Sequence, residues 1–336
     1  MTTTTTRPTP DSSLDASDTE KTFGLDFEHV TKRYKGESVV SDLSFTVHPG
    51  RVTGFLGPNG AGKSTTMKIL LGLASADEGT ATIGGRRYRD LPDPAGTVGA
   101  VVETDAFHPG RSGRDHLQVL ADASGVASTR VDEMLEVVEL DAAGDRRAGA
   151  YSLGMRQRLG LAAALLLDPP VLVLDEPGNG LDPQGVRALR GLLRDRAARG
   201  HTVLVSSHLL AEVEHLADDV VVVHHGQLVT QGSLEELQHG AALVRCTETG
   251  ALKSELEAAG AVVEATGTNT LVVRGLEIDD VGERAFRAGI PLHELSPHAG
   301  SLEEMFFNWT TDRADAPAVP AVEDRRLRLD REGTTS

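Results

Sequence analysis

The chain has 336 residues, enough to bury an α/β core and to carry a second small domain. Its 33 basic and 50 acidic residues give a net charge of −17 at pH 7, which argues against a general binder of nucleic acid or of anionic membranes. The single cysteine, Cys246, excludes an internal disulfide and fits a reducing compartment.

The two ends of the chain differ in composition from its middle. Residues 1–23 are rich in Thr, Ser and Pro and have no apolar stretch of the signal-peptide kind, so we expect a disordered tail. The charged residues 311–336 are also predicted to be a disordered tail. Apolar runs such as Leu161–Leu167 are far shorter than the ~18 residues of a membrane span, so we expect none.

A glycine-rich segment carries the first chemical motif, GxxxxGK[ST]. A strand is expected before it, over Val52–Leu56, and a helix after it, over Lys63–Leu73. Glycines let the backbone close around phosphates, the Lys63 ammonium reaches the β- and γ-phosphates, and the Ser64 hydroxyl is a ligand for Mg²⁺. The segment therefore predicts a nucleoside triphosphate site. Its residues are Gly57, Pro58, Asn59, Gly60, Ala61, Gly62, Lys63, Ser64 and Thr65.

The stretch from about residue 106 to residue 168 is predicted to be mostly helical. Its clearest apolar series at helical spacing is Val131, Met134, Leu135, Val138 and Leu140. Ser152 then opens a further helix. The free N–H groups at a helix start attract anions, so Ser152 and Gly154 are candidates for holding a phosphate.

A buried strand over Val171–Leu174 ends in two adjacent carboxylates, Asp175 and Glu176. Such a pair can hold magnesium and activate a water, but it is also common where a core strand meets solvent. The glycine-rich motif upstream favours the chemical interpretation. Further strands are expected over Thr202–Ser206 and Val220–His224.

The order of these motifs, from about Leu25 to Gly232, resembles the ATP-binding-cassette (ABC) ATPases. The series comprises the P-loop, a helical insert, a Ser-x-Gly helix start, an LDEP strand, an NGLD segment and an SSH segment. The resemblance implies an α/β P-loop NTPase core of RecA-like fold over 24–238. It also implies an antiparallel β subdomain, a helical subdomain at about 106–168, and an ATPase that uses ATP and Mg²⁺.

The family's roles carry over by position. Tyr34 matches the aromatic residue that stacks on adenine, although a half-buried strand aromatic would look the same. Asp175 matches the Walker B carboxylate, which holds Mg²⁺ through water. Glu176 matches the catalytic glutamate that polarises the attacking water, and Lys63 assists it by offsetting charge. His208 matches the switch histidine that contacts the γ-phosphate.

A second group of matching residues implies a dimer. Residues 179–182, ending in Asp182, match the D-loop, which crosses the dimer interface in this family. Ser152 and Gly154 match the signature motif, which faces the nucleotide of the opposing subunit. The resemblance therefore implies a head-to-tail homodimer with ATP between the P-loop of one subunit and the signature of the other.

Two motifs depart from the family's commonest form. The signature, usually LSGGQ, reads Tyr-Ser-Leu-Gly-Met, so Leu153 and Met155 replace a glycine and a polar residue. Glu103 stands at the Q-loop glutamine position, where it could still approach Mg²⁺ and the nucleotide. Both departures together resemble the ATP-binding subunits of bacterial exporters for drugs and peptide antibiotics.

The expected function is therefore ATP hydrolysis that drives export of a drug, antibiotic or peptide, with a role in antibiotic resistance. The pore would be a separate integral membrane permease of ABC-2 type. The chain would be cytoplasmic, peripheral on the inner face of the cell membrane, and without a nucleic-acid partner. The alternatives are an importer, a lipid or polysaccharide exporter, a soluble cassette ATPase acting on nucleic acid or ribosomes, and a non-hydrolysing ATP sensor.

Residues 239–310 are predicted to form an accessory α+β domain. Strands and helices alternate as βαββαβ, the ferredoxin-like pattern. The expected elements are Ala242–Cys246, Ala251–Ala259, Val262–Ala265, Thr270–Arg274, Asp279–Gly289 and Pro291–Leu295. Residues 301–310 resemble the terminal helix of bacterial exporter ATPases. The domain is either a regulatory or dimer-supporting module or a packing appendage without a ligand.

Overall fold

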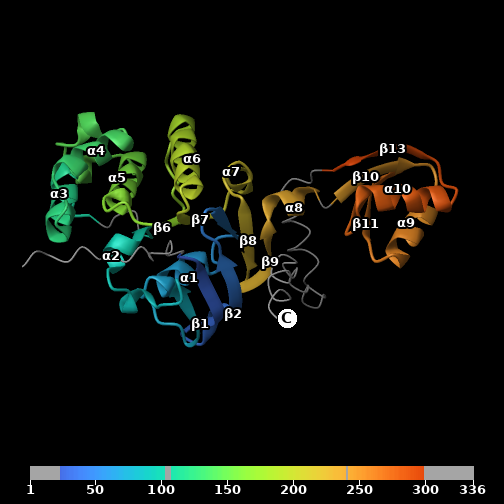
Figure 1. Ribbon diagram of the computed structural model, residues 1–336, viewed down its shortest axis with the longest axis horizontal. Helices are drawn as coiled ribbons and strands as arrows, with labels where there is room; N and C mark the ends of the chain where they lie inside the picture. Colours follow the sequence, from blue (N-terminus) through green and yellow to red (C-terminus); the bar gives the residue numbers. More distant parts are fainter. Residues whose placement is uncertain (1–22, 103–106, 240, 299–336) are drawn as a thin grey trace, which may run out of the picture.

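A computed structural model describes residues 23–102, 107–239 and 241–298 (Figure 1). The predictions for the two tails, for Glu103 and for residues 301–310 lie outside these residues, apart from Phe23.

A six-stranded sheet forms the centre of the molecule. Its strands lie in the order β5-β6-β7-β3-β8-β9, all parallel except β9. Side chains of one strand alternate between two clusters: Leu172 and Leu174 face one, Val171 and Val173 the other. Both faces are therefore covered, which explains why these strands are apolar throughout. The bounds are Val98–Val101 (β5), Val171–Asp175 (β6), Thr202–Ser207 (β7), Val52–Leu56 (β3), Asp219–His224 (β8) and Gln227–Ser233 (β9).

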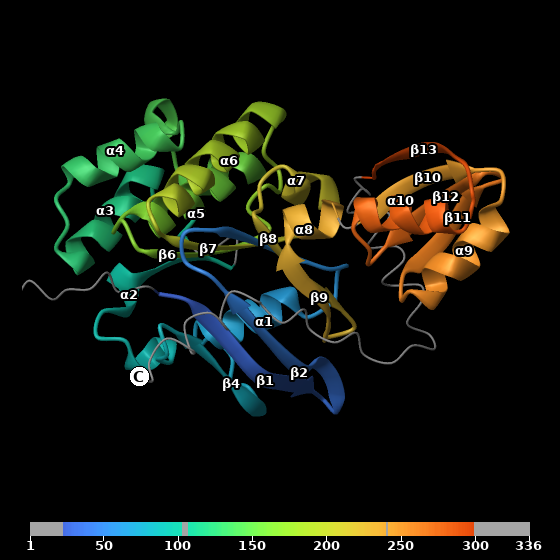
Figure 2. The ribbon, with the colours of Figure 1, turned by 45° about the vertical axis from the view of Figure 1, so that its right-hand side comes forward.

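An antiparallel sheet of order β2-β1-β4 packs with helix α1 on one side of the central sheet (Figure 2). Phe27 and Phe45 stack with ring centroids 4.2 Å apart, and Phe45 lies 5.2 Å from Phe55 of β3. This aromatic series joins the two sheets. The bounds are Leu25–Tyr34 (β1), Glu37–Val47 (β2), Glu78–Ile83 (β4) and Lys63–Leu70 (α1).

Helices cover the other side of the central sheet (Figure 2). The predicted apolar series from Val131 to Leu140 is buried in this cluster. Its helical spacing is confirmed for Val131, Met134 and Leu135, whereas Val138 and Leu140 follow the end of the helix. Ser112 caps one helix by accepting a hydrogen bond from the Asp115 N–H. The bounds are Gly113–Ser124 (α3), Thr129–Val137 (α4), Leu153–Leu165 (α5), Pro183–Ala198 (α6) and Leu210–Glu214 (α7), with short 3₁₀ turns at Asp141–Ala143 and Ala148–Ala150. A 3₁₀ turn at Tyr88–Asp90 and the short helix Pro94–Thr97 (α2) precede β5 in the chain.

Helix α1 ends at Leu70, earlier than the predicted Leu73, because Gly72 adopts φ +68°. The Gly72 N–H donates to the carbonyl of Ile69, and the Leu73 N–H donates to that of Lys68. This pair of bonds is the Schellman arrangement, which satisfies the last carbonyls of a helix and turns the chain away from its axis.

The C-terminal elements form a separate four-stranded antiparallel sheet of order β11-β12-β10-β13, covered by α9 and α10. This order and the βαββαβ succession define the predicted ferredoxin-like fold. Helix α8 lies between the two sheets in the chain (Figure 1). The bounds are Leu234–His239 (α8), Ala241–Cys246 (β10), Thr249–Ala258 (α9), Val262–Gly267 (β11), Thr270–Arg274 (β12), Ile278–Arg287 (α10) and Leu292–Pro297 (β13).

We expect Leu159→Ala to lower the free energy of unfolding by about 2–5 kcal/mol, because it leaves a cavity among α3, α4 and α5. Leu159 is fully buried there. Urea denaturation followed by circular dichroism measures the change. The control is Leu73→Ala at a side chain that is 65% exposed, which should cost no more than about 0.5 kcal/mol. Equal losses in both variants would contradict the assigned packing.

Candidate functional site

The P-loop runs from Gly57 to Gly62 between β3 and α1, and its close backbone contacts require glycine. A Cβ at Gly57 would lie 2.4 Å from the carbonyl oxygen of Val223. Gly62 has φ +96°, and a Cβ there would lie 2.7 Å from the carbonyl oxygen of Val39. Because a side chain would be blocked at both positions, the glycines of the motif serve the fold of the loop itself.

A hollow of about 150 Å³ opens over this loop and the start of α1. It is lined by Val39, by Glu176, by residues 58–62 of the P-loop and by the first three residues of α1, Lys63, Ser64 and Thr65. The first turn of α1 reads Lys-Ser-Thr-Thr, so it presents a cation, hydroxyls and free backbone N–H groups. This combination suits an anion at a helix N-terminus.

Lys63 is buried beneath the hollow, with 6% of its surface exposed. Its Nζ donates hydrogen bonds to the carbonyl oxygens of Gly57 at 2.6 Å and Pro58 at 3.3 Å, and lies 3.7 Å from Oε1 of Glu176. Burial lowers the pKa of Lys63, while the carboxylates of Glu176 and Asp175 act in the opposite direction. The ammonium group is thus held rigidly by backbone carbonyls against the glutamate.

The end of β6 is fixed by the next strand along the sheet. Asp175 pairs with Ser206 of β7 in the strand register. The Ser206 hydroxyl donates to Oδ1 of Asp175 at 2.5 Å and accepts from the Glu176 N–H at 2.9 Å. Glu176 has φ +51°, a conformation that non-glycine residues adopt rarely. The serine therefore holds both carboxylate residues, one of them in a strained backbone conformation.

The side chain of Glu176 meets that of His208. Oε2 of Glu176 and Nδ1 of His208 share a hydrogen bond, and Nδ2 of Asn179 donates to the same oxygen at 3.3 Å. Nε2 of Gln157, on α5, donates to the Glu176 carbonyl at 3.3 Å. The structure thus brings Lys63, Glu176 and His208 together from three separate segments.

The signature residues lie at the start of α5. The Ser152 hydroxyl caps this helix by accepting from the Met155 N–H at 3.3 Å. A Cβ at Gly154 would lie 2.5 Å from the Gly180 carbonyl oxygen, and a Cβ at Gly180 would lie 2.7 Å from Cγ of Leu153. The helix start therefore packs on the D-loop, and Leu153 remains 52% exposed.

Two other predicted residues lie elsewhere. Asp182 caps α6 by accepting from the Gly185 N–H at 2.8 Å, and lies 3.6 Å from Arg158. Tyr34 is half exposed at the end of β1, where Lys32 Nζ lies 5.3 Å from its ring centroid. Among the described residues, the lining of the hollow includes neither of these, nor Ser152 or Gly154.

Sequence reasoning missed three residues of this site: Gln157, Asn179 as a partner of Glu176, and Ser206. Gln157 carried little signal, since it stands between Arg156 and Arg158 in the sequence, yet it is 3% exposed. Its Oε1 has no hydrogen-bond partner in the part of the chain that the structure describes. Ser206 could be found only from the pairing of β6 with β7, because the amino-acid sequence does not reveal which strands are neighbours in the sheet.

Within residues 23–102, 107–239 and 241–298, no group of three or more His, Cys, Asp or Glu is placed to hold a metal ion. The oxygen donors available are instead the Ser64 hydroxyl, which lines the hollow, and the Asp175 carboxylate, which acts electrostatically on Lys63. Mg²⁺ is usually bound by one or two such oxygens together with substrate phosphates and water. The donor set therefore fits Mg²⁺ bound with a triphosphate. The described helices include none long and apolar enough to cross a bilayer.

Fold and site together define a P-loop nucleotide-binding protein. The family model described as "ABC transporter" matches residues 40–179, and one described as a domain of unknown function matches residues 240–303.

Two similar proteins are the bacitracin transport ATP-binding protein of Enterococcus faecalis and the Nod factor export ATP-binding protein I of Burkholderia orbicola. The first is 40% identical over 64% of this chain and 71% of its own length. The second is 39% identical over 85% of this chain and 96% of its own length. A solved structure of an ATP-binding subunit of an ABC transporter is 26% identical, with a TM-score of 0.58, over 78% of this chain and 99% of that one. The chain belongs to the ABC transporter family, as one of its ATP-binding and ATP-hydrolysing proteins.

We expect Gly62→Ala to destabilise the protein by about 1–2 kcal/mol and to weaken ATP binding, because it adds a Cβ at positive φ against the Val39 carbonyl. The matched control is Gly191→Ala in α6. There, within the described residues, a Cβ would meet no heavy atom within 4 Å. Alanine should stabilise that helix by up to about 1 kcal/mol. Thermal unfolding and calorimetric ATP titration measure both variants. Unchanged ATP affinity in Gly62→Ala would contradict the close contact between Gly62 and the Val39 carbonyl.

Proposed function

We propose that this protein is the ATP-hydrolysing subunit of a bacterial exporter, in which ATP turnover drives a separate membrane permease. The observation that carries the proposal is the carboxylate of Glu176, which lines the P-loop hollow between Lys63 and His208. A carboxylate so placed can orient a water toward the γ-phosphate of a triphosphate bound on the P-loop. Residues 24–238 would form this ATP-binding unit and 239–310 an accessory unit.

Each remaining residue has a distinct proposed role. Lys63 offsets negative charge on the β- and γ-phosphates, and the P-loop N–H groups bind the phosphate oxygens. Ser64 and Asp175 hold Mg²⁺, which would neutralise further phosphate charge. His208 fixes the orientation of the Glu176 carboxylate and contacts the γ-phosphate. Tyr34 would stack on adenine. Glu103, which lies outside the described residues, would approach Mg²⁺ and the nucleotide from the Q-loop.

A second copy of the chain is proposed to complete the site. Ser152 and Gly154 present a helix start, suited to an anion, at a place that does not line the subunit's own hollow. Gly180 and Leu181 of the D-loop, which precede Asp182, pack against that helix start. In a head-to-tail dimer both would face the nucleotide of the partner.

The proposed direction of transport, the transported substrate and the cellular location of the protein rest on its relatives and on the two motifs that depart from the family's commonest form. The relatives include proteins for bacitracin transport and Nod factor export. Leu153, Met155 and Glu103 are the residues that resemble the exporter branch. We therefore propose export of a drug, antibiotic or peptide through an ABC-2 type permease, with the protein bound to the cytoplasmic face of the cell membrane.

We expect Glu176→Gln to lower kcat for ATP hydrolysis at least about 100-fold, because the amide cannot accept a proton from water. Affinity for ATP should stay within a few-fold of the wild type. Phosphate release and calorimetric titration measure the two quantities. The control is Glu136→Gln on the exposed face of α4, which should hydrolyse ATP normally. Wild-type turnover in Glu176→Gln would refute the catalytic role.

We expect Ser152→Asp in the Glu176→Gln background to prevent ATP-dependent dimerisation. Aspartate still caps α5, so the fold is kept, but its charge would repel the partner's triphosphate. Light scattering with ATP and Mg²⁺ measures the dimer. The control is Ser112→Asp, which makes the same change at the cap of α3. Dimers that form equally well in both variants would contradict the head-to-tail arrangement.

A further inference from the structure

Glu212 lies on α7, directly after the segment that carries His208, and has no part in the motifs described above. It is half-buried. The Ser207 hydroxyl donates to its Oε2 at 3.3 Å and accepts from the Leu209 N–H at 3.0 Å. Ser207 immediately precedes His208. One side of the carboxylate is therefore bound to the histidine segment.

The same carboxylate also lies against Gly178, two residues after Glu176. A Cβ at Gly178 would be 3.1 Å from Oε2 and 3.3 Å from Oε1 of Glu212. This backbone leads directly from Glu176 to Asn179, which donates to the Glu176 carboxylate. Glu212 thus contacts both segments whose side chains meet in the Glu176–His208 hydrogen bond.

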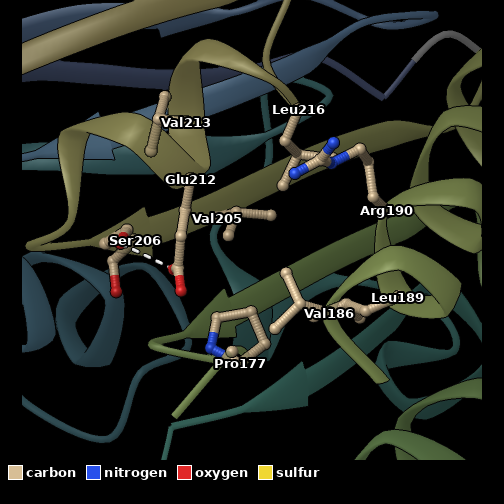
Figure 3. A pocket seen from close by; sticks show the side chains of 11 residues that line it. Pro177, Val186, Leu189, Arg190, Val205, Ser206, Glu212, Val213 and Leu216 are labelled. Atoms are coloured by element: carbon tan, nitrogen blue, oxygen red, sulfur yellow. Dashed lines mark hydrogen bonds between the residues drawn. The ribbon is translucent and has the colours of Figure 1, made fainter. Parts of the chain in front are cut away.

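Below the carboxylate is a small cavity of about 30 Å³ between α6 and α7 (Figure 3). Apolar side chains from both helices form much of its wall, among them Val186 and Leu189 of α6 and Val213 of α7, and Arg190 of α6 also lines it. These apolar side chains supply little that fixes the direction of a carboxylate. Its orientation therefore depends on the Ser207 hydrogen bond and on close packing against Gly178.

We propose that Glu212 is a positioning residue for ATP hydrolysis: it holds the histidine segment and the segment after Glu176 at a fixed separation. The proposal rests on the catalytic roles proposed above for Glu176 and His208. The Glu176–His208 hydrogen bond spans two segments from neighbouring strands, so a small shift between them changes its geometry. Glu212 prevents that shift without touching the nucleotide.

The ordinary explanation for an acidic residue here is a favourable charge in the first turn of α7. That role involves stability alone and needs neither Ser207 nor Gly178. The two explanations therefore differ in whether the effect of changing Glu212 depends on Ser207 and Gly178. Variants of the full-length protein can measure that dependence.

We expect Glu212→Ala to lower kcat by between about 10- and 100-fold, the scale seen when distant changes misplace reacting groups. KM and ATP affinity should change little, since Glu212 does not line the P-loop hollow. Glu212→Gln should recover most of the activity, because its carbonyl oxygen can still accept from Ser207. The control is Glu136→Ala, on an exposed face of α4, with wild-type kcat.

A double-mutant cycle tests the coupling to Gly178. Gly178→Ala should lower kcat in the wild-type background, because its Cβ displaces the Glu212 carboxylate. In the Glu212→Ala background the same change should have no further effect, since the side chain it displaces is gone.

Several results would overturn the proposal. The first is a kcat for Glu212→Ala equal to that of Glu136→Ala. The second is that the fold-losses of kcat in Gly178→Ala and Glu212→Ala simply multiply in the double variant. The third is a loss of kcat in Glu212→Ala that unfolding at the assay temperature explains wholly. Failure of the proposed function would look different, because Glu176→Gln and His208→Ala would then hydrolyse ATP like the wild type. Both sets of variants belong in the same assay for this reason.

Discussion

The buried parallel sheet is the constraint on which the rest of this structure depends. Because β3, β6 and β7 run parallel and lie side by side, their carboxyl ends meet at one edge. The P-loop follows β3, the paired carboxylates end β6, and the histidine segment follows β7. Strand order alone therefore brings together residues that are more than a hundred positions apart in the chain. The apolar side chains of these strands, which alternate between two cores, keep that edge in place.

The sequence predicts much of this arrangement. Runs of buried residues predict β3, β6 and β7 to within a residue or two, and the glycine motif predicts the phosphate site. The ferredoxin-like succession after residue 240 is also predicted correctly. These successes come from local patterns: apolar periodicity, turn residues and motifs whose chemistry needs a fixed spacing.

Other features could not be predicted, because they arise from contacts between distant segments. The hydrogen bonds from Ser206 to Asp175 and from Gln157 to Glu176 depend on strand order and helix placement. The packing of Leu153 on Gly180 requires α5 to cross the D-loop. The end of α1 was predicted too late, since the bonds after Gly72 that end the helix depend on its backbone conformation rather than on hydrophobicity.

Glu176 is held at φ +51°, where a non-glycine residue raises the energy of the folded chain by about 1 kcal/mol or more. The chemistry of the site and the stability of the fold therefore favour different residues at this position. Selection for heat resistance alone would relax this backbone, and glycine, which tolerates that angle, would remove the carboxylate. If Glu176 has the catalytic role proposed above, a cassette changed in that way would be more stable and would lose hydrolysis, so stability and turnover make opposite demands on this one position.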